Sequence, residues 1–149
     1  MAIWFKTHVR RISVRATPIQ RVARSVLVQA GHPTAQLSLS LVGKTRMRSL
    51  NRKYRGRDYP TDVLAFPMGS SRKQTEVFLG DVVICLPVAI GQASRFENTA
   101  DQEILRLLIH GTLHLLGYDH EQSKREATRM QRKERAIVQK LSPFPRLLI

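Results

Sequence analysis

Three of the five histidines in this chain lie within one short segment, HGTLHLLGYDH, at residues 110 to 120. His110 and His114 are four residues apart, so on a helix they project from the same face and can both reach a single ion. Gly117 can end that helix in a left-handed turn that brings His120 back as a third nitrogen ligand. Three imidazoles with a fourth coordination position open are typical of a catalytic zinc site.

The residue after the first of these histidines decides which hydrolytic chemistry is favoured. Metzincin peptidases share this histidine spacing and carry a glutamate there as the general base. The residue here is Gly111, which cannot accept a proton. A metal ion can still lower the pKa of a bound water to about 7, so hydrolysis stays open while peptide hydrolysis is disfavoured. Two satisfied core histidines are the alternative, although burying two imidazoles in an apolar run costs free energy unless each has a partner.

The net charge of +14 is distributed unevenly along the chain. Residues 1 to 57 hold thirteen Lys or Arg and no acid, whereas the remainder holds twelve against all eleven acids. A basic half joined to a nearly neutral half with a metal site predicts a polyanionic partner, and nucleic acid fits best. The alternatives are a solvated cationic surface and a mitochondrial transit segment, since the arginines from Arg10 to Arg24 occur without an acid.

Length and cysteine content predict one domain over residues 1–149, with a single core large enough to need no disulfide. Cys85 is the only cysteine and lies in an apolar stretch, where it packs as a small hydrophobe. The apolar runs fall short of about 18 residues, so no membrane span is expected. These features favour the cytoplasm, with the mitochondrion as the alternative that the basic segment leaves open.

Periodicity and end signals predict the elements that must position the histidines. Thr17 as N-cap with Pro18 at the first position predicts a helix that ends at Gly31. Thr99 and Gln102 match a capping box that starts the helix carrying His110 and His114. The other expected elements are strands at 36–41, 62–66 and 79–86, a short helix through Met47, Leu50 and Tyr54, a helix at 87–96, and a charged helix after His120.

Three ordered motifs now carry a resemblance to a known family. The segment at 110–120, LNRKYRGRDYPTDVLAFP at 50–67 and LGDVVIC at 79–85 resemble the YbeY family of metal-dependent endoribonucleases. The resemblance implies a single α+β domain with a mixed sheet packed against helices, including a zincin-like metal-binding helix. It also implies one divalent ion, best matched by Zn²⁺, and single-strand-specific cleavage of RNA. Ribosomal RNA maturation and ribosome quality control follow as expected roles, with the ribosome or its proteins as partners.

The same resemblance assigns residues beyond the histidines. Arg55 matches the family's phosphate-binding arginine, and a guanidinium can grip a phosphate in a bidentate way that suits phosphodiester cleavage. Ala65 stands where the family has a serine, so a hydroxyl is missing. Arg57 matches a second position that is usually basic in the family, and Arg52 and Lys53 are further RNA-binding candidates. Apart from the resemblance, Asp119 can orient a histidine ring as an acceptor or shape the turn before His120, and Asp81 can cap the end of its strand or belong to the site.

Two other functions remain open from the sequence. One is a zincin-type metallopeptidase whose base comes from elsewhere in the fold. The other is a ribosome-associated RNA-binding factor in which the metal is structural and no turnover occurs.

Overall fold

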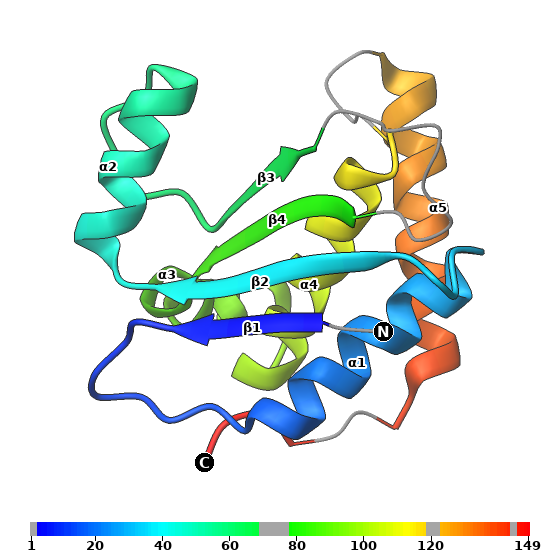
Figure 1. The fold of residues 1–149 in the computed structure, drawn as a ribbon, viewed down its shortest axis with the longest axis horizontal. Coiled ribbons are helices and arrows are strands. Elements are labelled where there is room, and N and C mark those ends of the chain that lie inside the picture. The colour runs from blue at the N-terminus through cyan, green and yellow to red at the C-terminus, as the bar shows by residue number, and fades with distance from the viewer. Residues whose placement is uncertain (1–2, 69–77, 119–122, 144–145) are drawn as a thin grey trace.

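A computed structural model describes residues 3–68, 78–118, 123–143 and 146–149 of the chain. It is an α+β fold in which five helices surround one four-stranded mixed sheet, as expected (Figure 1). The strand order is β1-β2-β4-β3, with β1 and β2 parallel, β2 and β4 parallel, and β3 and β4 antiparallel. The strands are β1 (Ile3–Thr7), β2 (Gln36–Val42), β3 (Val63–Pro67) and β4 (Phe78–Cys85).

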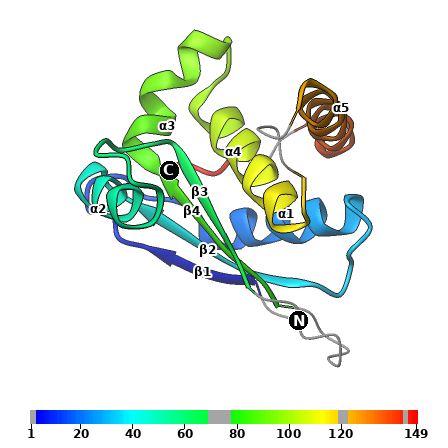
Figure 2. The ribbon, with the colours of Figure 1, turned by 90° about the horizontal axis from the view of Figure 1, so that it is seen from above.

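The helices are distributed unequally over the two faces of this sheet. Four of them lie on one side (Figure 2), and their apolar faces meet the inward residues of β2 and β4 in the main core. The leucines of β2 alternate with serines and are fully buried, which confirms the predicted half-buried strand. These four helices are α1 (Ala16–Gln29), α3 (Leu86–Gln92), α4 (Ala100–Leu115) and α5 (Lys124–Leu141).

Helix α2 (Lys44–Arg55) packs on the opposite face through a second, smaller cluster. Met47 of α2 is fully buried there against Leu64, Val83 and Cys85. Burial raises the pKa of the Cys85 thiol, which agrees with its predicted role as a small apolar residue. No helix in the described part of the chain is long and apolar enough to cross a membrane.

The predicted start of the first helix was wrong. Helix α1 begins at Ala16 with Arg15 as N-cap, and no side chain caps it. The backbone N–H of Arg15 donates to the carbonyl of Leu147 at 2.8 Å, so pairing with the end of the chain holds Arg15 extended and sets the helix start. Pro18 is tolerated at the third helical position because that N–H has no acceptor within the helix. Apolar residues from β1 to the start of α1 pack in or against the main core.

The predicted helix at 87–96 is divided in two. It consists of α3 followed by a 3-10 turn at Ala93–Phe96, after which Glu97 adopts a left-handed conformation with φ of 56°. Helix α4 then starts with the complete capping box that was predicted. Thr99 accepts from the backbone N–H of Gln102, and the Gln102 side chain accepts from the N–H of Thr99. This cap fixes the register of the helix that carries the two histidines.

Candidate metal centre and nucleic-acid cavity

His110 and His114 lie on one face of α4, as their spacing predicted. Their ring centroids are 4.8 Å apart with the planes at 64°. Both side chains line a cavity of about 750 Å³ between α4 and the edge strand β3, called here the β3–α4 cavity. The residues lining it that concern the chemistry are Arg55, Arg57, Asp62, Ala65, Arg106, His110, Gly111, His114, Gly117 and Tyr118.

A carboxylate from another helix holds the first histidine. Nδ1 of His110 lies 2.6 Å from Oε1 of Glu134 on α5, and both side chains are mostly buried. A carboxylate on one ring nitrogen orients a histidine that binds a metal through its other nitrogen. The sequence reasoning missed Glu134 and proposed Asp119 or Asp81 for this role. A signal existed, because Glu134 lies between Met130 and Ile137 on the buried side of α5.

The third predicted ligand, His120, lies outside the described residues, as does Asp119. Gly117 has φ of 98°, and its N–H donates to the carbonyl of His114 at 3.0 Å. The predicted left-handed turn after the helix is therefore confirmed. Within the described ranges no three His, Cys, Asp or Glu side chains gather closely enough to hold a metal. The structure therefore places two of the three predicted ligands together.

Gly111 is glycine for a packing reason that the sequence did not reveal. A Cβ added at this position would lie 2.7 Å from Cγ1 of Val82 and 3.4 Å from Cγ2 of Val63. Helix α4 therefore approaches the sheet so closely at this residue that even a methyl group would force Val82 to shift. The position that carries the general base in zincin peptidases is closed by the sheet itself.

Arg55 reaches the same cavity from the opposite side. It is the last residue of α2, and Gly56 follows it in a left-handed conformation with φ of 69°. Its Nη2 donates to the backbone carbonyl of Ala65 on β3 at 2.9 Å, and its guanidinium lies 5.3 Å from the centre of the Phe66 ring. The anchor is a main-chain oxygen, so the missing hydroxyl at Ala65 does not affect it. The side chain remains exposed.

The other basic residues predicted near the site divide into two groups. Arg57 lines the β3–α4 cavity with Arg55. Arg52 and Lys53 are exposed on α2 and are not among the described residues that line it; the Lys53 ammonium lies 5.2 Å from the centre of the Tyr54 ring instead.

Asp81 is not brought to the histidines. It is exposed on β4, next to Val82, and successive strand residues face opposite sides of a sheet. Val82 faces α4, where it meets Gly111, so Asp81 points to the face that carries α2. A role in orienting His110 or His114 is therefore not supported for this residue.

A buried carboxylate network supports the α4 side of the cavity. Glu103 has no exposed surface and accepts from Nε and Nη2 of Arg106, both at 2.7 Å. Gln92 donates to Glu103 at 2.7 Å and to Asp62 at 3.0 Å, which ties α3 and α4 to the start of β3. The hydrogen bond from Arg106 to Glu103 raises the pKa of Arg106. Sequence reasoning missed this network, although Arg106 interrupts an apolar run, which was a usable signal.

The comparisons with known proteins decide the family. A family description, endoribonuclease YbeY, matches residues 5–142. The chain belongs to this family. YbeY proteins are named as endoribonucleases, hydrolases that act on RNA in ribosomal RNA processing, and the family is metal-dependent in general.

Individual relatives agree with this assignment along most of the chain. The endoribonuclease YbeY of a Sulfurihydrogenibium species is 39% identical over 83% of this chain and 82% of its own. That of Aquifex aeolicus is 38% identical over 89% of this chain and 88% of its own. A solution structure of a protein from Thermotoga maritima is 26% identical, covers 94% of this chain and 89% of its own, and superimposes with a TM-score of 0.65.

Proposed function

We propose that this chain is a metal-dependent endoribonuclease that cuts single-stranded RNA in the β3–α4 cavity, with ribosomal RNA as its substrate. The observation that carries this proposal is the placement of two histidines and two arginines around one cavity. His110 and His114 come from α4, whereas Arg55 and Arg57 come from the end of α2 and the loop after it. A scissile phosphate between them would meet metal ligands on one side and guanidinium groups on the other.

The residues present fit a metal ion. Two imidazoles share one helix face, and Glu134 holds Nδ1 of His110, which is the second partner that a metal-binding histidine requires. His120 completes the proposed ligand set, and a set of three imidazoles suits Zn²⁺ among the first-row metals. When bound, such an ion supplies Lewis-acid polarisation of the phosphate and activation of the nucleophile.

Arg55 stabilises the charge that develops during cleavage. Phosphodiester hydrolysis builds negative charge on the non-bridging oxygens, and a preorganised cation beside them lowers the barrier. One edge of the guanidinium is anchored by the Ala65 carbonyl and by the Phe66 ring. The other N–H groups of Arg55 can bind the phosphate in a bidentate manner. Arg57 adds a second cation at the same end of the cavity.

The geometry disfavours the peptidase alternative. Val82 occupies the space that the side chain of a general base at position 111 would need. The carboxylate that lines the cavity among the described residues is Asp62, and it is occupied by hydrogen bonds. Its Oδ1 accepts from the N–H of Val63 at 2.8 Å, and its Oδ2 accepts from Gln92 at 3.0 Å.

A cleavage assay with matched variants tests the proposal. Unstructured RNA should be cut by the protein supplied with Zn²⁺, and both His114→Ala and chelation should remove the activity. Arg55→Lys should lower kcat by about 10²-fold or more, because an ammonium does not reproduce the bidentate grip. Arg46→Lys, on the same helix but away from the cavity, is the matched control and should cleave normally. Cleavage that survives both metal removal and His114→Ala would rule the mechanism out.

Two further arms separate the alternatives. Casein should not be digested, and RNA binding without turnover would identify a non-catalytic factor. The proposal includes association with the ribosome in the cytoplasm and a role in ribosome quality control. Those parts are tested by sedimentation of the protein with ribosomal particles and by the accumulation of unprocessed ribosomal RNA when His114→Ala replaces the wild type.

A further inference from the structure

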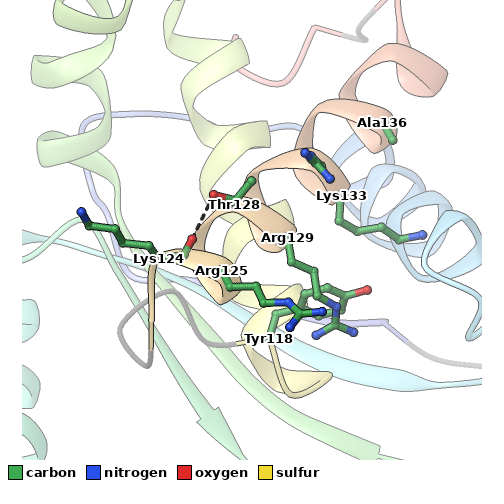
Figure 3. A pocket seen from close by; sticks show the side chains of 8 residues that line it. Tyr118, Lys124, Arg125, Thr128, Arg129, Lys133 and Ala136 are labelled. Atoms are coloured by element: carbon green, nitrogen blue, oxygen red, sulfur yellow. Dashed lines mark hydrogen bonds between the residues drawn. The ribbon is translucent and has the colours of Figure 1, made fainter.

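A second concave surface lies on the outer side of α5, next to the β3–α4 cavity. It is an open groove of about 650 Å³, called here the α5 groove (Figure 3). Its charged lining residues recur along one helix at Lys124, Arg125, Arg129, Arg132 and Lys133. The row from Lys124 to Lys133 spans nine helical steps, or about 14 Å.

Within the described part of the chain, few acids compensate the positive charges of this groove. Helix α5 carries seven Lys or Arg and two acids, Glu126 and Glu134. Glu134 is occupied by His110 at 2.6 Å, on the side of the helix that faces the core. Glu126 contacts Arg129 at 3.3 Å. No Asp or Glu is found among the described residues that line the groove.

The polar but uncharged Thr128, which also lines the groove, already has a hydrogen-bond partner within α5. The hydroxyl of Thr128 donates to the carbonyl of Lys124 at 2.9 Å within the helix. Figure 3 shows Arg125 and Arg129 extending toward the ring of Tyr118, and the guanidinium of Arg129 lies 4.3 Å from the centre of that ring. The surface is therefore a row of cations with one aromatic ring at its end.

Tyr118 connects this groove to the proposed active site. It follows the turn at Gly117, and it lines both the α5 groove and the β3–α4 cavity with His114. A polyanion that occupies the cavity can therefore continue past Tyr118 onto α5 without leaving the protein surface. An aromatic ring at such a junction can also stack on an unpaired base.

We propose that the α5 groove binds the phosphate backbone of single-stranded RNA where the strand leaves the β3–α4 cavity. This inference rests on the proposed function, since it takes the strand in the cavity to be RNA. Cations repeated along about 14 Å suit a chain with a charge on every unit, and the spacing follows one helix face. The groove continues into the cavity at Tyr118, so one RNA strand can occupy both surfaces. An acidic protein bound to the groove would not need to extend to the histidines, and the substrate strand is therefore the favoured occupant.

The test measures RNA binding without turnover. Fluorescent oligouridylate of about 16 nucleotides is titrated with the full chain in EDTA across a range of salt concentrations. The groove variant combines Lys124→Gln, Arg125→Gln, Arg129→Gln and Arg132→Gln, all at exposed positions. Its affinity should fall at least tenfold, and the slope of log K against log salt should become shallower by about 3, which corresponds to four lost phosphate contacts at 0.7 each.

A matched control variant removes four positive charges from a part of the surface away from the groove. Lys6→Gln, Arg10→Gln, Arg11→Gln and Arg21→Gln lie at exposed positions of the first strand, the following loop and α1. This variant should bind within about twofold of wild type. A second groove variant, with Arg125→Lys, Arg129→Lys and Arg132→Lys, keeps the positive charge and should retain most of the affinity for RNA. Thermal unfolding of each variant confirms that it is folded.

Several outcomes would overturn the inference. Equal losses in the groove and control variants would show that only the net charge matters, and no loss in the groove variant would exclude the surface. Displacement of the RNA by polyglutamate at equal charge concentration would indicate an acidic protein instead. Cleavage measured separately with Zn²⁺ keeps the two proposals apart. RNA binding localised to α5 without any cleavage would refute the proposed function alone, whereas cleavage with unaffected binding would refute this inference alone.

Discussion

The two walls of the β3–α4 cavity hold their functional side chains in different ways. On the α4 wall, His110 is held by Glu134 and Arg106 is held by the fully buried Glu103, each through bonds of 2.6 to 2.7 Å. On the β3 wall, Arg55 is exposed and donates to two backbone carbonyls, that of Ala65 at 2.9 Å and that of Tyr54 at 3.4 Å. The α4 wall is therefore preorganised by short, mostly buried hydrogen bonds to carboxylates, which suits metal ligands that must converge. The β3 wall leaves its guanidinium able to adjust to a phosphate.

The largest expected effect concerns the buried pair of the α4 wall. Glu103→Ala removes the carboxylate acceptor of Arg106 and one of the two acceptors of Gln92, and it should lower the free energy of unfolding by about 3 kcal/mol. Urea unfolding followed by far-UV circular dichroism measures this. Glu97→Ala, an exposed acid in the preceding turn, is the control and should change stability by less than about 0.5 kcal/mol. Equal effects at the two positions would mean that the network does not stabilise this wall.

The second-largest expected effect is a loss of stability at Gly111, where α4 approaches the sheet closely. Gly111→Ala forces a methyl group against the buried Val82 and should destabilise the fold by about 2 kcal/mol. Adding Val82→Ala makes room for that methyl group, so the double variant should be more stable than the two single losses predict together. Additive losses in this double-mutant cycle would argue against the contact.

A smaller effect is expected from the carboxylate behind His110. Glu134→Gln keeps the shape but removes the charge, and it should weaken Zn²⁺ binding by about 10- to 100-fold. Isothermal titration calorimetry with the metal alone gives the constant. Glu126→Gln on the same helix contacts Arg129 instead, so it should leave the affinity unchanged. If both variants bound Zn²⁺ as tightly as wild type, Glu134 would not orient a ligand.

The smallest effect lies on the β3 side, beside Arg55. The hydrogen bond from Arg48 holds the pKa of Asp58 below its usual range. A lowered carboxyl pKa contributes stability above the unfolded pKa of about 3.9 and loses it as the pH falls through the folded value. Both side chains are exposed, so the contribution is small. Asp58→Asn should lower the urea midpoint slightly at pH 7, and the difference should shrink as the pH falls below about 4; a difference that stays constant with pH would contradict the pairing.

The charge distribution along the chain indicated only part of the candidate site. Of the thirteen Lys or Arg in the acid-free residues 1 to 57, Arg55 and Arg57 are the ones that line the β3–α4 cavity within the described part of the chain. Arg24 instead donates to the carbonyls of Pro33 and Ala35 at 2.9 and 2.7 Å. The nearly neutral second half carries the row of cations on α5 because several of its acids are engaged in folded contacts. Net charge along a chain does not report which charges remain on the surface.

The sequence by itself determined the local geometry of the candidate site. The four-residue spacing of His110 and His114, the capping box at Thr99 and the left-handed turn at Gly117 depend on helix periodicity and backbone sterics, which act over a few residues. Tertiary structure alone decided that Glu134 holds His110 and that Val82 excludes a side chain at Gly111. Those pairs come from segments 24 or more residues apart, and packing of separate elements brings them together.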